Sequence, residues 1–210
     1  MAQWEEVRHQ VAIAGRVTDA QTSQAIGRAR VSITDGPLAF NNWLANHARQ
    51  YGDRWETMME RPDRIQSAAD GHFHFMDLPD GQYTLTASLP GSGTRYSTTR
   101  QVATVSRDVH GNITMAVADM NLPPTTLKGR ITRQDNDPVV MAEVRVKGSG
   151  ERVFSDGEGR YLLAGLEASD ERERTLLVTA QGYQQASQDV LLDQAGGEKT
   201  VDFVLVPSAL

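Results

Sequence analysis

Two histidines lie two residues apart, in a segment where apolar and polar residues alternate. His72 and His74 flank Phe73. Residues i and i+2 of a strand leave the same face, so both imidazoles would point to one side. Imidazole binds Zn²⁺, but a zinc site needs three or four ligands, so His110 or Asp77 would have to contribute. The other interpretation is the solvent-facing side of a strand whose phenylalanines are buried.

Two acidic runs could supply oxygen ligands to Ca²⁺. They read Asp135-Asn136-Asp137 and Asp156-Gly157-Glu158. A dedicated calcium loop spaces several carboxylates around the ion, and neither run has that spacing. Asp, Asn and Gly are also the residues that turns favour. We interpret both runs as turns, and we predict no bound metal and no other cofactor.

An aromatic segment between residues 37 and 64 has the spacing of an amphipathic helix. Large apolar side chains recur there at steps of three and four residues, which places them on one helix face. They are Phe40, Trp43, Leu44, Ala48, Tyr51, Trp55, Met58 and Met59. Pro62 ends the predicted helix, and Gly52 could divide it in two.

The apolar face of this helix has two interpretations. It could cover the open edge or end of a β-sandwich as local core, or it could stay exposed and bind a partner. Trp, Tyr and Met are enriched at protein interfaces. Trp4, on a polar N-terminal arm, could likewise pack back or anchor a neighbour. The candidate partner-binding residues are therefore Trp43, Tyr51, Trp55, Met58 and Trp4.

The elements that position these residues occur twice. Residues 67–78 read SAADGHFHFMDL, and residues 155–166, which are 88 positions later, read SDGEGRYLLAGL. Upstream, the run Ala29-Arg30-Val31 matches Ala142-Glu143-Val144 at an offset of 113. The first copy therefore carries about 25 extra residues (113 − 88), and these form the aromatic segment. A duplicated β-unit makes a single catalytic centre an unlikely purpose for the chain.

Alternating apolar residues predict the strands of both copies. In the first copy we expect strands at 11–18, 29–34, 71–76, 82–88, 100–106 and 112–120. In the second we expect them at 126–132, 142–147, 151–155, 160–164, 175–181, 187–192 and 200–206. One buried and one solvated face per strand is typical of antiparallel sheets that pack as a two-layer sandwich.

Turn and linker residues divide the chain into three parts. The run Leu122-Pro123-Pro124-Thr125 reads as a stiff linker. We expect an arm at 1–10, a first sandwich at 11–123 with an inserted helix at about 37–64, and a second sandwich at 124–210. The predicted fold class is all-β.

Composition limits the partners and the compartment. The net charge is −6 with no basic block, which argues against nucleic-acid binding. No apolar run approaches the roughly 18 residues of a membrane helix, so we expect no membrane insertion. The first ten residues lack the basic start and apolar run of a signal peptide, and the chain has no cysteine. We therefore predict a cytoplasmic protein, which could form part of a releasable particle.

The first copy carries the motif Gly-x-Phe-x-Phe-x-x-Leu-Pro-x-Gly-x-Tyr-x-Leu at 71–85. Together with the run Gly15-Arg16-Val17, this motif resembles the carboxypeptidase regulatory-like domain, whose fold is the prealbumin-like or transthyretin-like sandwich. The second copy is similar at 129–131, 144–146 and 155–161 but departs from the pattern after Leu166. The first copy has Ala68 where the family usually has aspartate.

The resemblance implies an accessory module and not an enzyme. The same fold includes 5-hydroxyisourate hydrolases, but their C-terminal Tyr-Arg-Gly-Ser is absent, because this chain ends Pro-Ser-Ala-Leu. Intradiol dioxygenases hold iron with two tyrosines and two histidines, and no cluster of this chain combines both residue types. No nucleophile elbow or phosphate-binding glycine loop occurs either. We predict a non-catalytic protein.

These observations favour a structural adaptor that contacts protein subunits of a larger complex. Transthyretin-like modules also decorate contractile, phage-tail-like injection particles, and that is the assembly we favour. One alternative is a carbohydrate- or surface-binding module of an exported protein. Another is a metal-dependent enzyme that uses the His72 and His74 pair. The sequence does not specify the partner or the oligomeric state.

Overall fold

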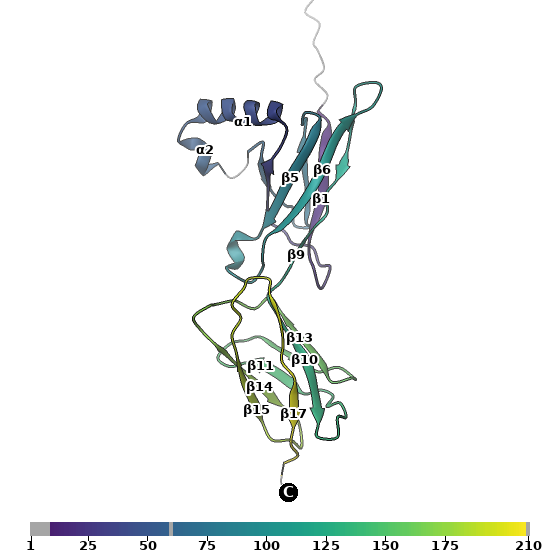
Figure 1. The fold of residues 1–210 in the computed structure, drawn as a ribbon, viewed down its shortest axis with the longest axis vertical. Coiled ribbons are helices and arrows are strands. Elements are labelled where there is room, and N and C mark those ends of the chain that lie inside the picture. Colours follow the sequence, from purple (N-terminus) through teal and green to yellow (C-terminus); the bar gives the residue numbers. More distant parts are fainter. Residues whose placement is uncertain (1–8, 59–60, 209–210) are drawn as a thin grey trace, which may run out of the picture. The chain divides into compact units, whose positions relative to one another are not determined.

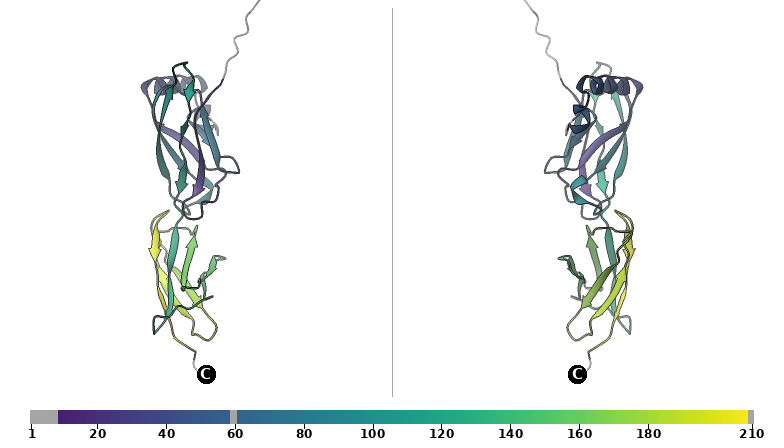
Figure 2. Two further views of the ribbon diagram at one scale, coloured as in Figure 1. Left: turned by 90° about the vertical axis from the view of Figure 1, so that its right-hand side faces the viewer. Right: turned by 90° about the vertical axis from the view of Figure 1, so that its left-hand side faces the viewer.

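The computed structural model describes residues 9–58 and 61–208 and consists mainly of β-strands (Figure 1). It divides into two compact units. The first contains residues 1–90 and 98–122, and the second contains residues 91–97 and 123–210. Side views show the strands of each unit in layers (Figure 2). The predicted all-β class, with two tandem sandwiches and a helical insertion in the first, is confirmed.

The first unit has two sheets. One is ordered β4-β1-β8, with β9 also paired to β1. Its strands are β1 (Val11–Asp19), β4 (His72–Met76), β8 (Ala116–Val117) and β9 (Met120–Leu122). The other is ordered β3-β2-β5-β6-β7. Its strands are β2 (Arg30–Asp35), β3 (Arg64–Gln66), β5 (Gly81–Ser88), β6 (Thr99–Arg107) and β7 (Ile113–Thr114), and a short 3₁₀ turn, η1 (Pro90–Ser92), follows β5.

The second unit repeats this plan. One sheet is ordered β13-β10-β16, with β17 also on β10. Its strands are β10 (Thr126–Arg133), β13 (Arg160–Ala164), β16 (Glu198–Thr200) and β17 (Phe203–Leu205). The other sheet is ordered β12-β11-β14-β15. Its strands are β11 (Glu143–Val146), β12 (Arg152–Phe154), β14 (Arg174–Thr179) and β15 (Ala186–Val190).

The apolar residues that alternate along the predicted strands lie in the cores of the two sandwiches. In β4 both phenylalanines are buried while both histidines are exposed, and in β13 Tyr161 and Leu163 are buried. Val11, an apolar residue of the strand expected at 11–18 that we predict to face the core, is instead 37% exposed. A register irregularity lies between Val11 and Ile13, and a bulge shifts which residues of a strand face the core.

A glycine sits at the same crossing in both sandwiches. A Cβ atom on Gly15 would lie 2.2 Å from the Ala118 carbonyl oxygen, and one on Gly129 would lie 1.9 Å from that of Val201. The backbone amide of the residue after each glycine donates its hydrogen bond to an aspartate side chain and not to a backbone carbonyl. Arg16 N donates to Asp119 Oδ1 at 2.9 Å, and Arg130 N donates to Asp202 Oδ1 at 2.7 Å.

This crossing explains the gap between β8 and β9 and that between β16 and β17, whereas β7 pairs with β6 in the other sheet. The expected strand at 112–120 is divided into β7, β8 and β9, and the one at 200–206 into β16 and β17. The parallel pairing with the first strand keeps one register on both sides of the gap: Ala14 faces Val117 and Val17 faces Met120. The aspartate therefore interrupts the ladder without shifting it. The short strand β3 was not predicted.

A buried serine is a second shared feature. Ser67 Oγ donates to the Ile26 carbonyl at 2.7 Å and accepts from Ala29 N at 3.0 Å. Ser155 Oγ bonds in the same way to the Val139 carbonyl and to the amide of Ala142, at 2.7 and 2.9 Å. A buried hydroxyl that both donates and accepts has its polar requirements met. In both copies it holds the start of the second strand.

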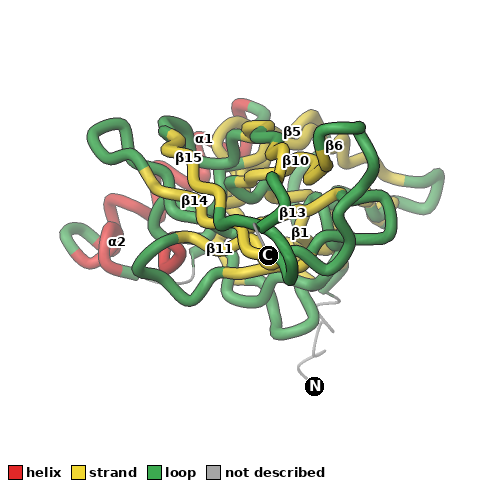
Figure 3. Tube along the Cα trace, turned by 90° about the horizontal axis from the view of Figure 1, so that it is seen from below, coloured by secondary structure: helices red, strands yellow, loops and turns green. Residues whose placement is uncertain are grey.

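The insertion forms two helices, α1 (Leu38–Tyr51) and α2 (Arg54–Thr57), which are red in Figure 3. Gly52, with φ of 53°, ends α1 and its amide donates to the Ala48 carbonyl. The predicted helix is therefore shorter than expected and broken at this glycine. Neither helix, nor any other within the described residues, has the length and apolar composition needed to span a bilayer.

The second unit includes a short segment from the middle of the chain. Residues 91–97 lie between β5 and β6 in sequence, and our predicted boundaries place them in the first module, but they belong to the second unit. Thr125 Oγ1 donates to the Thr94 carbonyl at 2.8 Å, and Thr125 N donates to the Arg95 carbonyl at 2.8 Å. Arg95 Nη1 lies 3.2 Å from Glu151 Oε1 and donates to the Gly165 carbonyl at 2.6 Å.

We expect Gly15→Ala and Gly129→Ala each to lower the free energy of unfolding by about 2 kcal/mol or more, because the new methyl group would collide with backbone atoms that cannot rotate away. Urea denaturation followed by circular dichroism measures this. Gly157→Ala is the matched control, since no atom lies within 4 Å of a Cβ at that position. Equal stability of all three variants would contradict the role of the crossing.

We expect Arg95→Ala to lower the free energy of unfolding at neutral pH by about 1 kcal/mol, since the side chain is partly exposed. Hydrogen bonds from Ser149 and Arg95 lower the pKa of Glu151. A lowered pKa adds stability above the unfolded-state pKa, and this stability is lost as the pH falls through the folded value. The difference between variant and wild type should therefore shrink in acid. Arg100→Ala, on the exposed side of β6, is the control, and a loss that did not depend on pH would contradict the ion pair.

Candidate partner-binding site

The insertion is anchored to the first sandwich by one buried aromatic contact. Phe40, in the first turn of α1, is 1% exposed. Its ring meets the edge of Tyr83, with centroids 5.4 Å apart at 77°. Burial raises the pKa of Tyr83 to about 12, and its hydroxyl donates to the Pro79 carbonyl at 2.7 Å. The helix therefore starts from a fixed point on β5.

Beyond this anchor, α1 leaves large apolar side chains in solvent. Leu38, Trp43 and Tyr51 are 74%, 43% and 47% exposed. Trp43 lies against Phe40 on one side and His47 on the other, with ring centroids 5.9 and 4.3 Å away. These contacts restrict the indole while one side of it remains free. Two of the predicted anchors, Trp43 and Tyr51, are thus available at the surface.

The other two insertion anchors are placed differently. Trp55 in α2 is only 7% exposed, and the Arg61 guanidinium lies 4.6 Å from the centre of its ring. Arg61 is held in turn by Asp63, with Nε to Oδ1 at 2.9 Å and Nη2 to Oδ2 at 2.7 Å. Met58 is half-buried, and its carbonyl accepts a hydrogen bond from Arg64. Trp55 therefore belongs to the local core that supports α1.

An apolar groove of about 560 Å³ runs between α1 and the end of β4, and we call it the α1 groove. Phe40 and Trp43 form one wall, and Met76, Leu78 and Pro79 form the other. Met76 is 42% exposed. Ligand-binding clefts are mostly apolar with a few polar groups, and this groove has that character.

The two histidines of β4 leave the same face, as their spacing predicts, but they have different surroundings. His72 Nδ1 lies 3.1 Å from Asp70 Oδ2, whereas His74 lines the α1 groove. Hydrogen bonds from His72, from its backbone amide above all, lower the pKa of Asp70. Within residues 9–58 and 61–208, no group of three or more metal-ligating side chains gathers.

The acidic runs form turns with local partners. Asp135 Oδ1 accepts the amide of Asp137, whose carboxylate pairs with Arg133. Asp156 accepts the amides of Glu158 and Arg160, and these bonds lower its pKa. Their carboxylates are engaged within the turns, as the turn interpretation expects.

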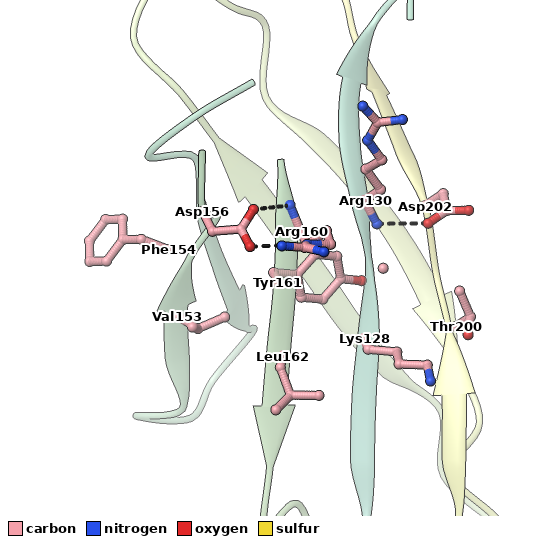
Figure 4. A pocket seen from close by; sticks show the side chains of 11 residues that line it. Lys128, Arg130, Val153, Phe154, Asp156, Arg160, Tyr161, Leu162, Thr200 and Asp202 are labelled. Carbon is pink, nitrogen blue, oxygen red and sulfur yellow. Dashed lines mark hydrogen bonds and ion pairs between the residues drawn. The ribbon is translucent and has the colours of Figure 1, made fainter. Parts of the chain in front are cut away.

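A second groove of about 560 Å³ lies in the second unit (Figure 4). Lys128 and Arg130 of β10 and Arg160 and Leu162 of β13 line it, and Phe154 of β12 stands at its side. Phe154 and Leu162 are 46% and 43% exposed. The sequence analysis did not predict this groove. The available signal was alternation: Leu162 lies between the buried Tyr161 and Leu163, and Phe154 follows the partly buried Val153.

Two of the cationic side chains that line this second groove form ion pairs. Lys128 Nζ lies 2.5 Å from Glu198 Oε1, and Arg160 Nε lies 3.1 Å from Asp156 Oδ2. Beneath them, burial raises the pKa of Tyr161, whose hydroxyl donates to the Val201 carbonyl at 2.6 Å. The groove therefore presents apolar surface beside the ion pairs of Lys128 and Arg160. The remaining predicted anchor, Trp4, lies outside the described residues.

Comparison with solved structures finds pilins among the similar chains. The shaft pilin SpaA from Lactobacillus rhamnosus GG matches 97% of this chain over 99% of its own, at 13% identity and a TM-score of 0.46. GBS52, the minor pilin of Streptococcus agalactiae, matches 96% over 98% of its own, at 14% identity and a TM-score of 0.32. The Bacillus anthracis TIE protein matches 93% at 13% identity and a TM-score of 0.39, and this chain spans 34% of it.

The predicted location is corrected by these comparisons. We expected a cytoplasmic protein, but the similar solved structures are pilins, which are extracellular proteins. The expectation rested on the first ten residues and on the missing cysteines, and neither observation is a property of the fold. The cytoplasmic prediction is therefore wrong.

The family is defined by sequence. No curated protein matches the chain. The family model described as the carboxypeptidase regulatory-like domain matches residues 12–116 and 126–206, which is one match for each sandwich. The shared glycine crossing and buried serine agree with this duplication. The chain belongs to the carboxypeptidase regulatory-like domain family, with two tandem copies of the domain.

Proposed function

We propose that this protein is a non-catalytic structural adaptor that joins protein subunits of a larger assembly through the exposed side of α1. The observation that carries the proposal is the exposure of Leu38, Trp43 and Tyr51 on α1, a helix that has no counterpart in the second domain. Exposed aromatic side chains on a rigid support are typical of interface anchors.

The way α1 is held makes it suitable for binding. Phe40 fixes its start, and the buried Trp55, held by Arg61, supports the segment that follows. Tyr51 approaches Trp55, with ring centroids 6.1 Å apart. Side chains that are already restrained lose less conformational entropy on binding, so more of the contact energy appears as affinity.

The titratable groups support a non-catalytic role. The carboxyl pKa shifts resolved in the described chain are all downward, as at Asp77, Asp108 and Asp193, and they come from hydrogen bonds to neighbouring groups. A carboxyl group that acts as a general acid at neutral pH usually needs a raised pKa. Members of this family are mostly accessory modules, which agrees with the same view.

The kind of assembly is a further part of the proposal. Transthyretin-like modules occur in contractile, phage-tail-like injection particles, and we propose such a particle as the assembly. Purification of the native complex under mild conditions, followed by mass spectrometry, tests it. Tail-tube, sheath or spike subunits would support the particle, and a fibre built from this chain alone would contradict it.

We expect the double variant Trp43→Ala, Tyr51→Ala to lose at least tenfold in the amount of partner that co-purifies, because two anchors are removed. Its unfolding free energy should change by less than about 2 kcal/mol, since each side chain is only about half buried. The readout is the ratio of partner to tagged protein in the native complex.

Two controls make this result specific. Val102→Ala removes an exposed side chain from β6 in the same unit and should leave partner binding intact. Trp55→Ala should destabilise the protein by about 3 kcal/mol, because it empties a buried site. Unchanged partner recovery with the double variant would refute the proposed docking face.

A second candidate function is carbohydrate binding by the second unit, which Phe154 at the open groove favours. Sugar rings stack on exposed aromatic faces. Lys128 and Arg160, which form ion pairs with Glu198 and Asp156, could instead donate hydrogen bonds to sugar hydroxyls. We expect the wild-type protein to bind on a glycan array, Phe154→Ala to abolish that binding, and Trp43→Ala to leave it unchanged. Absence of any glycan signal from the wild-type protein would refute this candidate.

A further inference from the structure

We propose that the second unit binds a tetrahedral oxyanion of the phosphate type between two arginines on the hairpin of β11 and β12. Arg145 of β11 and Arg152 of β12 are direct partners in the antiparallel register, so their side chains leave the same face of the sheet. They border a cavity of about 280 Å³, whose other lining residues are Glu143, Ser149, Gly150 and Glu151. The site belongs to the second unit alone and does not depend on the docking function proposed for α1.

The two arginines form an unfavourable pair as long as no anion lies between them. Like charges that face each other across two strands destabilise a sheet. The Arg152 side chain is 66% exposed, and its Nη1 lies 3.9 Å from Glu143 Oε1, which is a loose ion pair. Within residues 9–58 and 61–208, the exposed side chain of Arg145 forms no ion pair. One of the two guanidinium groups therefore lacks a counter-ion from the described chain.

The other carboxylate beside the cavity is already engaged. Arg95 Nη1 lies 3.2 Å from Glu151 Oε1. Hydrogen bonds from Ser149 and Arg95 lower the pKa of Glu151, so this carboxylate stays charged and keeps its own partner. Its charge is thus matched by Arg95, and it does not neutralise the two opposed arginines.

A third cation follows on the same face. Lys147 is two residues after Arg145, and its amide continues the ladder by donating to the Thr175 carbonyl at 2.9 Å. Its side chain is exposed and forms no ion pair in the part of the chain that the structure describes. Three cations therefore gather here against the single free carboxylate of Glu143, on a protein whose net charge is −6.

Opposed guanidinium groups favour a tetrahedral anion over a carboxylate. A carboxylate has two oxygens, and one arginine can occupy both of them in a bidentate pair. A phosphate group offers three acceptor oxygens and nearly two negative charges at neutral pH, so it can accept from both arginines at once. The turn beside them leaves space for it, because a Cβ atom on Gly148 or Gly150 would meet no atom within 4 Å.

The first unit does not have this pair. At the offsets of the repeat, 113 and 88, the two positions correspond to Ser32 and Arg64, which also face each other across two strands. Arg64 is half-buried, and it donates a hydrogen bond to the Met58 carbonyl of the insertion. The first copy thus has one arginine with a structural contact, whereas the second copy has two exposed arginines. The anion site is therefore a property of the second copy and not of the shared fold.

Titration of the whole protein with inorganic phosphate tests the site. Amide signals of Gly148 and Gly150 in the NMR spectrum report binding, with sodium chloride used to keep the ionic strength constant. We expect saturable shifts in the wild type and about fivefold weaker binding, or less, for Arg145→Gln and for Arg152→Gln. Arg100→Gln removes an exposed arginine of β6 in the first unit and should leave the affinity unchanged. Phosphate shifts that do not saturate would refute the site.

Thermal unfolding separates binding from structural support. Phosphate should raise the unfolding temperature of the wild type to a plateau set by its affinity, and it should not do so for Arg145→Gln. Without phosphate this variant should be at least as stable as the wild type, because the opposed charges are gone. Arg145→Lys keeps the charge but loses the planar fork, so it should bind with intermediate affinity. An equal rise with phosphate in the wild type and in Arg145→Gln would overturn the proposal, since it would show a general salt effect.

Other anions define the ligand. Sulfate has the same shape and should bind with an affinity similar to that of phosphate, whereas acetate should bind about tenfold more weakly. Acetate that bound as tightly as phosphate would overturn the tetrahedral assignment. A phosphoserine peptide that bound more tightly than inorganic phosphate would assign the site to a phosphate ester, and equal or weaker binding of the peptide would assign it to the free anion; both results support the site.

Discussion

In each sandwich an aspartate carboxylate takes the place of a backbone carbonyl as the hydrogen-bond acceptor for one amide of the first strand. At the crossing of Gly15 with Ala118, and of Gly129 with Val201, the two backbones come so close that only glycine fits. The ladder breaks there, and an aspartate side chain accepts the amide that would otherwise be unpaired. Because the pairing resumes in the same register, the last strand stays in place on the first, and both cores close around that contact.

The insertion is the main difference between two sandwiches that otherwise share one strand plan. In the second unit the connection between β11 and β12 is a short turn, whereas the corresponding connection of the first unit carries α1 and α2. Phe40, Trp55 and Arg61 hold this addition without changing the sandwich below. Function is often carried by loops that a rigid scaffold positions, and here the scaffold is the repeated part and the loop is the unique part.

The two units also offer different surfaces. The α1 groove is aromatic and lies beside the residues that tie the start of the described chain to Asp77. The groove of the second unit is bordered by two ion pairs, Lys128 with Glu198 and Arg160 with Asp156. The second unit additionally takes in residues 91–97, where Arg95 and Thr94 bond to strand ends and turns that lie far away in sequence. Duplication has thus kept the fold while the surfaces have diverged.

The sequence alone determined the class of fold, the duplication and most of the core, because period-two alternation and turn residues are local signals, as at Phe73 and Phe75 or Tyr161 and Leu163. It also located the insertion and its aromatic residues. Only the tertiary structure decided that Trp43 is exposed while Trp55 is buried, that Arg95 belongs to the second unit, and that Asp119 and Asp202 interrupt the closing strands. Each of these depends on contacts between residues distant in sequence, which no local pattern records.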